Sequence, residues 1–181
     1  MKQRIGVYAG SFNPFHLGHL DIANQSLVVF DKVVIAIGRN PAKDDIDREP
    51  FPYASVAIKD RFAVVPFHGL LANFLNELDL QMGYEDSEIF LIRGLRDGED
   101  LHFEQNQLQF IREMYPSVKP VFFVCGKQFE HISSSALRQL KKISPDDYYK
   151  YVLTQPERKP VPLNPFPRYD DGPVYERDGP N

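Results

Sequence analysis

Residues 8–20, which read Tyr-Ala-Gly-Ser-Phe-Asn-Pro-Phe-His-Leu-Gly-His-Leu, constrain the fold of this chain more than any other stretch. An apolar run that starts at Ile5 predicts a buried strand ending at Gly10, and the proline and glycine that follow mark a short loop. Apolar residues then recur at helical spacing, at Leu20, Ile22, Ala23, Leu27 and Phe30. The stretch therefore predicts a strand, a loop and a helix beginning near His19, which is the repeating unit of a parallel α/β sheet.

The rest of the chain repeats this alternation of short apolar runs and helical patterns. We expect strands over residues 4–8, 32–37, 62–67, 88–92 and 120–125. We expect helices over residues 18–30, 53–61, 70–78, 98–115, 134–143 and 146–153. Because the strands are almost continuously apolar, both faces of the sheet should be covered by helices. The predicted fold is α/β: a Rossmann-like, doubly wound, parallel five-stranded sheet with helices on both faces.

The C-terminal region differs in character from what precedes it. At 181 residues the chain is large enough for one domain with a proper core. Seven of its 15 prolines lie after residue 155, where no hydrophobic period survives. We therefore expect one domain over residues 1–154 and a Pro-rich C-terminal tail over residues 155–181.

Composition excludes several classes of function. The formal net charge of −4 argues against a nucleic-acid partner, which usually needs a basic surface. The single cysteine rules out an internal disulfide framework and fits a reducing compartment. No signal-peptide pattern is evident, and no apolar run approaches the length of a membrane span. We expect a cytoplasmic protein whose partners are small molecules, with no nucleic acid and no membrane.

Basic and hydroxyl side chains follow the predicted strands, where ligands bind in parallel sheets. His16 and His19 follow the first strand, Arg93 and Arg96 follow the fourth, and the segment 131–135 follows the fifth. A helix that starts near His19 would also direct unpaired backbone N–H groups at an anion. The pattern indicates a site that grips phosphate oxygens, although neither a P-loop nor a GxGxxG motif is present.

The loop around the two histidines resembles a known motif. Gly10-Ser11-Phe12-Asn13-Pro14 followed by His16-x-Gly18-His19 is similar to the first motif of the HxGH nucleotidyltransferases. These enzymes transfer AMP or CMP from a nucleoside triphosphate to a phosphate-bearing acceptor. Taken as bare residues, the histidines could instead cap and pack the helix or bind a metal, but Cys125 has no partner for a structural zinc site.

Later motifs narrow the resemblance to one branch. Arg93-Gly94-Leu95-Arg96, followed by Asp100 and Glu104, is similar to bacterial phosphopantetheine adenylyltransferases. Ile132 and the three serines after it resemble the late motif of that family, and the shared motifs keep their order from about residue 5 to residue 140. The resemblance implies transfer of AMP from ATP to 4′-phosphopantetheine, which gives dephospho-coenzyme A and pyrophosphate. It also implies a homo-oligomer, commonly a hexamer.

The resemblance implies roles for individual residues. The catalytic group would be His19, Lys43 and Arg96. ATP would contact Ser11, Phe12, His16, His19, Gly94, Leu95, Arg96, Glu104, Phe129, Glu130, His131, Ile132, Ser133, Ser134 and Ser135. The acceptor would contact Ser11, Lys43, Leu71 and Arg93. The two serines at 134 and 135 also begin a predicted helix, where they could serve as caps alone.

The implied chemistry needs positioning and positive charge more than a base, because a phosphate monoester is already largely ionised near neutral pH. Lys43, Arg93, Arg96 and His19 are residue types that supply such charge. No carboxylate cluster reads as a metal cage, so we expect no protein metal site and a Mg²⁺ held mainly by the phosphates of ATP. We interpret Asp44, Asp45 and Asp47 as a solvated acidic loop rather than metal ligands.

Two alternatives stay open. His16, and serine and asparagine at positions 11 and 13, resemble nicotinamide-mononucleotide adenylyltransferases as much as the phosphopantetheine branch. Such an enzyme would keep the fold and the ATP donor but produce NAD. The other alternative is a nucleotide-binding protein of the same fold that does not turn over. Retention of His19, Lys43, Arg93 and Ser134 together argues against it.

Overall fold

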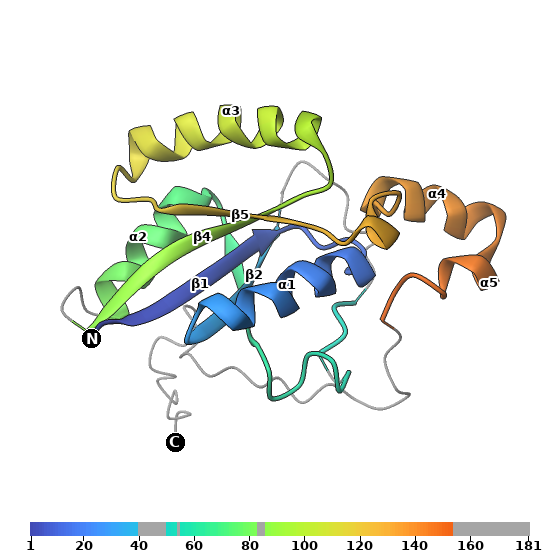
Figure 1. Ribbon diagram of the computed structural model, residues 1–181, viewed down its shortest axis with the longest axis horizontal. Helices are drawn as coiled ribbons and strands as arrows, with labels where there is room; N and C mark the ends of the chain where they lie inside the picture. The colour runs from blue at the N-terminus through green and yellow to red at the C-terminus, as the bar shows by residue number, and fades with distance from the viewer. Residues whose placement is uncertain (40–49, 54, 83–85, 154–181) are drawn as a thin grey trace, which may run out of the picture.

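The structure, a computed structural model, describes residues 1–39, 50–53, 55–82 and 86–153. It contains one five-stranded parallel sheet, whose strand order is β3-β2-β1-β4-β5 (Figure 1). The strands are β1 (Gln3–Gly10), β2 (Lys32–Arg39), β3 (Ala63–His68), β4 (Ser87–Leu95) and β5 (Pro120–Val124). All five predicted strands and the predicted fold class are therefore confirmed. The winding reverses between β1 and β4, which makes their carboxyl ends the expected ligand-binding edge.

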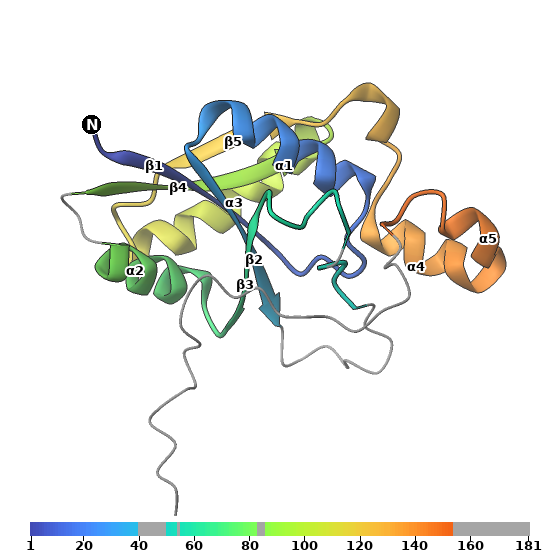
Figure 2. The ribbon, with the colours of Figure 1, turned by 90° about the horizontal axis from the view of Figure 1, so that it is seen from below.

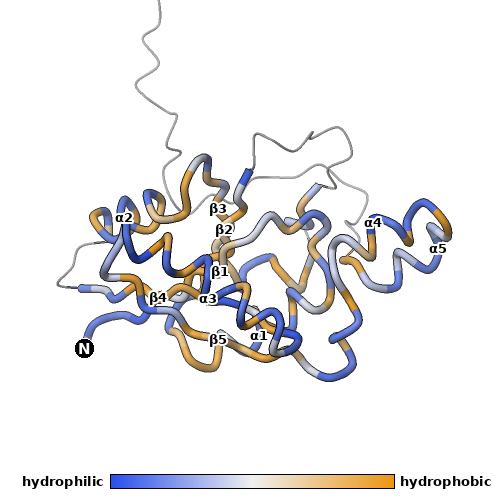
Figure 3. The backbone as a smooth tube through the Cα atoms, turned by 90° about the horizontal axis from the view of Figure 1, so that it is seen from above, coloured by the Kyte–Doolittle hydropathy of each residue, from blue (hydrophilic) through white to orange (hydrophobic). Residues whose placement is uncertain are grey.

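Helices cover both faces of the sheet (Figure 2). Helix α1 (Leu17–Val29) packs on one face, and α2 (Leu71–Met82) and α3 (Gly98–Met114) pack on the other. Successive strand residues point to opposite faces, so Val34 packs with α2 and α3 while Ile35 packs with α1. This explains why the strands are apolar without alternation. Figure 3 shows the hydrophobic residues gathered along the central strands.

A small subassembly lies beyond the carboxyl ends of the strands, at the right of Figure 1. It consists of the short 3₁₀ helix η2 (Lys127–Phe129), α4 (Ser134–Ile143) and α5 (Pro145–Tyr148). Its own core contains Ile132, Leu137 and Tyr148. Val152 forms an antiparallel bridge with His16, and the backbone N–H of Leu17 donates to the carbonyl of Tyr151 at 2.9 Å. These two contacts attach the subassembly to the start of α1.

Two helix predictions were wrong. The predicted helix over residues 53–61 is replaced, in the part that the structure describes, by successive turns that run to Arg61 and include Asp60, whose φ is 62°. The predicted helix over residues 146–153 is the short α5, because the chain turns after Tyr148 so that Val152 can pair with His16. The predicted tail, residues 155–181, lies outside the described residues. None of the helices within them has the length and apolar character needed to cross a membrane.

Candidate active site

A cleft opens at the carboxyl ends of β1 and β4, with a volume of about 360 Å³. Most of the predicted site residues meet there. They are Ser11, Phe12, His16, His19, Arg93, Gly94, Leu95, Arg96, Glu104, Phe129, Ile132, Ser133 and Ser134. The cleft is of the size that small-molecule substrates occupy in proteins. The structure thus assembles residues from four separate stretches of the chain into one site.

Some predicted residues are not part of this lining. Glu130, His131 and Ser135 flank it without lining it, and Leu71 packs against the core at the start of α2. A contact between Leu71 and an acceptor therefore stays a prediction. Lys43, like the acidic residues near it, lies outside the described residues. Sequence reasoning did not assign Tyr8, Ile22, Phe103 and Cys125, which line the cleft.

The two histidines form a reciprocal cap at the start of α1. His16 is the N-cap, and its Nδ1 accepts from the backbone N–H of His19 at 3.4 Å. The Nδ1 of His19 accepts in turn from the backbone N–H of His16 at 3.3 Å, and the rings stack with centroids 3.6 Å apart. A neutral imidazole that accepts at Nδ1 carries its proton on Nε2. Capping therefore sets the tautomer that makes Nε2 a hydrogen-bond donor.

Burial keeps both imidazoles neutral in the free protein. It lowers the pKa of His16 to about 4, with a smaller contribution from the Arg96 guanidinium. Burial also holds the pKa of His19 well below its usual value, and His16 and Arg96 lower it further. The expectation that His19 supplies a positive charge is therefore wrong for the free protein. His19 offers a neutral N–H donor at pH 7.

The depressed pKa of His16 predicts a loss of stability in mild acid. In the unfolded chain His16 takes up its proton near pH 6.5, whereas in the folded chain it does so near pH 4. The unfolded state thus binds more protons between these values, so the free energy of unfolding falls as pH falls through this window. His16 alone should account for about 3 kcal/mol of that loss. Urea unfolding at closely spaced pH values measures it.

A matched variant isolates the contribution of His16 from the rest of the acid response. His16→Asn keeps a side-chain acceptor at the N-cap and removes the titrating ring. It should make the stability profile between pH 6.5 and 4 less steep, and the slope that remains should come mainly from His19, whose pKa is also lowered by burial. The pKa values of Asp31, Asp100 and Glu88 are lowered by hydrogen bonds with Arg4, Arg96 and Lys119, so the stability that these carboxyl groups contribute is lost at the acid end of that window and below it. A profile as steep as the wild type's would contradict the account.

Phe12 forms an aromatic wall beside the histidines. Its φ is 45°, a left-handed conformation that a bulky residue rarely adopts. The ring is buried and lies edge-on to His19, with centroids 5.0 Å apart, and it also contacts Phe15. An unfavourable backbone conformation that persists in a packed loop is typical of functional sites. Here it directs the Phe12 ring against the imidazole that faces the cleft.

Two guanidinium groups also line the cleft, from the end of β4 and the residue that follows it. Nε of Arg93 donates to Glu104, and Nη1 of the same side chain donates to the carbonyl of Ala9 at 3.3 Å. Arg96 binds Asp100 through two hydrogen bonds, at 2.8 and 2.7 Å. The pKa of Asp100 is lowered by these bonds, so the carboxylate stays charged. Asp100 lies in the first turn of α3, and Arg96 lies just before the Asp97 cap of that helix.

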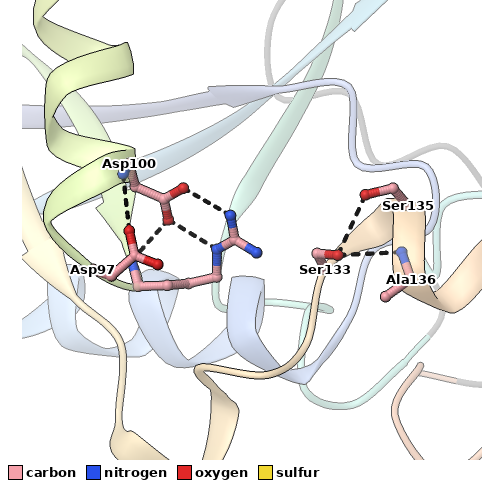
Figure 4. A network of polar contacts seen from close by, with 6 residues as sticks. Asp97, Asp100, Ser133, Ser135 and Ala136 are labelled. Atoms are coloured by element: carbon pink, nitrogen blue, oxygen red, sulfur yellow. Dashed lines mark hydrogen bonds and ion pairs between the residues drawn. The ribbon is translucent and has the colours of Figure 1, made fainter.

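Figure 4 shows how the start of α3 and the start of α4 present their polar groups across the cleft. Asp97 caps α3 by accepting from the backbone N–H of Asp100 at 2.9 Å. Ser133 caps α4 by accepting from the backbone N–H of Ala136 at 3.2 Å, and it lies 3.3 Å from the Ser135 hydroxyl. Ser133 therefore has the capping role that the sequence left open for Ser134 and Ser135.

The starts of α1 and α4 converge on the same cleft. The Ser134 hydroxyl donates to the carbonyl of Pro14 at 3.1 Å, and Arg138 donates to the carbonyl of Asn13 at 2.6 Å. These bonds join α4 to the loop before α1, and both helix N-termini contribute residues to the lining. Each N-terminus carries a partial positive charge and N–H donors. Their convergence favours a ligand with several negative charges.

A further contact anchors the segment that leads to α4. Asp21 on α1 accepts from the backbone N–H of Gly126 at 2.8 Å and from Gln25 at 2.9 Å. Gln25 also donates to the carbonyl of Val124 at 3.1 Å. The two side chains therefore fix the end of β5 on α1. Nothing in the local sequence around residue 21 indicates this contact, which joins residues 105 positions apart.

The described part of the chain contains no group of three histidine, cysteine, aspartate or glutamate side chains close enough together to hold a metal ion. The predicted loop of Asp44, Asp45 and Asp47 lies outside that part.

Comparison with known proteins agrees with this geometry. The family model described as cytidylyltransferase-like matches residues 7–140. The chain is 37% identical to the phosphopantetheine adenylyltransferase of Cytophaga hutchinsonii, over 79% of this chain and 93% of that protein. It is 32% identical to the enzyme of the same name from Beijerinckia indica, over 78% of this chain and 86% of that protein.

Solved structures share the fold at low sequence identity. A putative nicotinate-nucleotide adenylyltransferase from Vibrio parahaemolyticus superposes with a TM-score of 0.51 at 19% identity, over 85% of this chain and 88% of that one. A bifunctional NMN adenylyltransferase/ADP ribose pyrophosphatase from Francisella tularensis superposes with a TM-score of 0.55 at 17% identity, over 78% of this chain and 42% of that one. By its family match, its relatives and its His16-x-Gly18-His19 motif, the chain belongs to the cytidylyltransferase-like family of HxGH nucleotidyltransferases.

Proposed function

We propose that this protein is a phosphopantetheine adenylyltransferase, which transfers AMP from ATP to 4′-phosphopantetheine and releases pyrophosphate. The observation that carries the proposal is the 37% identity to a curated enzyme of that name over 93% of its length. The cleft supports it, because two helix N-termini and two guanidinium groups surround a volume suited to a polyphosphate.

The reaction is an in-line displacement at phosphorus. An oxygen of the acceptor phosphate forms a bond to the α-phosphorus of ATP, and the bond between that phosphorus and the oxygen bridging to the β-phosphate breaks. The electron pair leaves with pyrophosphate. The acceptor needs no general base, since the second pKa of a phosphate monoester is roughly 6. The protein has to align the reactants and stabilise the charge that develops on the transferred group.

The residues of the cleft divide this work. His19 donates from Nε2 to an oxygen of the transferred phosphoryl group, and Arg96 and the N-terminus of α1 balance the charge of the triphosphate. Arg93 and Lys43 hold the acceptor phosphate. Ser11, Phe12, Gly94, Leu95, Glu104 and the segment 129–135 contact ATP, and Leu71 contacts the acceptor arm. The lining of the cleft supports most of these assignments. Leu71, Glu130, His131 and Ser135 are not part of that lining, and Lys43 lies outside the described residues.

The proposal also includes a bound Mg²⁺ ion, an oligomeric state and a cellular location. Mg²⁺ bound to the phosphates of ATP would neutralise part of their charge. A homo-oligomer, a hexamer by family resemblance, and a cytoplasmic location stay predictions. Analytical ultracentrifugation of the full chain measures the oligomeric state directly.

Nicotinamide mononucleotide is the second candidate acceptor. The observation in its favour is His16, which resembles the nicotinamide branch, as do serine and asparagine at positions 11 and 13. The structure gives His16 a role that does not depend on the acceptor, since its Nδ1 caps α1. The presence of His16 therefore weighs less for nicotinamide mononucleotide than its sequence pattern suggests.

Pyrophosphate release tests the choice of acceptor. We expect the purified protein, with Mg-ATP, to release pyrophosphate when 4′-phosphopantetheine is added and not when nicotinamide mononucleotide is added. Release with the second alone would replace the acceptor and keep the enzyme class. ATP binding without release in either case would identify a nucleotide-binding protein that does not turn over.

A further inference from the structure

The cleft is lined by one buried tyrosine, Tyr8, to which the proposed mechanism gives no role. Tyr8 lies near the end of β1, is 6% exposed and lines the cleft. Its ring packs edge-on against Phe12, with centroids 5.1 Å apart, and lies 6.3 Å from the ring of His19. The hydroxyl lies at the start of the Gly94–Arg96 segment, since it would be 3.2 Å from a Cβ atom placed on Gly94. Tyr8 thus lies between the two strand ends that hold the site.

Among the described residues, no side chain or backbone group forms a hydrogen bond with the Tyr8 hydroxyl. The neighbouring Arg93 donates to Glu104 and to the carbonyl of Ala9 instead. A buried hydroxyl without a partner is unfavourable, and native proteins rarely keep one. Among the described residues, Asn24 Oδ1 is the one side-chain nitrogen or oxygen that is both fully buried and without a hydrogen-bond partner. The Tyr8 oxygen is therefore not fully buried. The hydroxyl therefore borders space that a ligand can fill.

We propose that the Tyr8 hydroxyl donates a hydrogen bond to a phosphate oxygen of a substrate bound in the cleft. The inference rests on the proposed function for the presence of phosphate ligands. The surroundings select a phosphate, because the N-terminus of α1, the Nε2 donor of His19 and the Arg96 guanidinium all attract an anion at this place. Burial raises the pKa of Tyr8, so the group stays a protonated donor throughout the working range of pH.

Tyr8→Phe tests the proposal, because it removes the hydroxyl and keeps the ring. Isothermal titration of the full chain with ATP and, separately, with 4′-phosphopantetheine should show about tenfold weaker binding of the ligand whose phosphate Tyr8 contacts. Adenosine, which has no phosphate, should bind the variant as it binds the wild type. The variant should melt at the wild-type temperature or above it, since it loses an unpaired buried hydroxyl.

Tyr115→Phe is the matched control. The Tyr115 hydroxyl is buried on the other face of the sheet and donates to Asp79 at 2.7 Å. Its loss should lower the melting temperature and leave the affinity for both phosphate ligands unchanged. The two variants therefore predict opposite patterns of stability and binding.

Several results would overturn the proposal. Unchanged affinity of Tyr8→Phe for both phosphate ligands, or an equal loss for adenosine, would remove the phosphate contact while leaving the proposed function intact. A melting temperature that falls as in Tyr115→Phe would show that the hydroxyl is structural. A wild-type protein that binds neither ATP nor 4′-phosphopantetheine would overturn both this contact and the proposed function.

Discussion

Replacing His19 by alanine is expected to lower kcat by about 10²- to 10³-fold, the usual cost of one preorganised donor to a charged transition state. The affinity for ATP should change less, because the N-terminus of α1 and Arg96 still line the cleft. The donor is effective because it is already oriented: the reciprocal cap places the proton on Nε2. Steady-state pyrophosphate release over a range of ATP and acceptor concentrations separates the effect on kcat from the effect on KM.

The alanine variant also removes half of the cap, so a second variant is needed. His19→Gln should keep the hydrogen bond to the backbone N–H of His16, because glutamine at this position is the usual partner in a capping box. We expect it to recover the melting temperature that His19→Ala loses and to stay slow in turnover. Turnover that recovers together with stability would show that His19 acts through the helix start alone. Wild-type turnover in the alanine variant would remove His19 from the mechanism.

The core of this site was predictable because its signals are local. A strand, a loop and a capped helix follow one another within residues 3–29, and the apolar pattern alone places His19 in the first turn of α1. Parallel strands then bring such segments to one edge of the sheet without any further information.

What the sequence could not predict depends on contacts between distant residues. Nothing near Asp21 indicates that it anchors the backbone of Gly126, and nothing near Tyr8 indicates that its hydroxyl reaches Gly94 near the end of β4. The predicted helix over residues 53–61 failed for a related reason. Its pattern was weak, and Phe51 and Ile58 pack into the α1 face of the sheet from a chain of turns. Tertiary packing overrode local propensity there.

Replacing Arg93 by alanine is expected to raise the KM for the acceptor by about 10- to 100-fold, the range for a lost hydrogen bond between charged groups. The KM for ATP should rise much less, since Arg96 and the helix N-termini remain. The geometry favours this role because Glu104 and the carbonyl of Ala9 hold the guanidinium at the carboxyl end of β4. An arginine has five N–H donors, so these two contacts leave others for a phosphate. Initial rates with each substrate varied in turn measure both constants.

Stability has to be separated from binding in this variant, because Arg93 and Glu104 are each only 15% exposed. Arg93→Ala leaves the Glu104 carboxylate without its partner, which should lower the free energy of unfolding. The double variant Arg93→Ala/Glu104→Gln removes that uncompensated charge, so it should recover stability without recovering the KM for the acceptor. Arg112→Ala, on the exposed end of α3, controls for the loss of a positive charge. An equal rise of both KM values in Arg93→Ala would mean that the two phosphate sites are assigned the wrong way, because Arg93 would then hold the nucleotide as firmly as the acceptor.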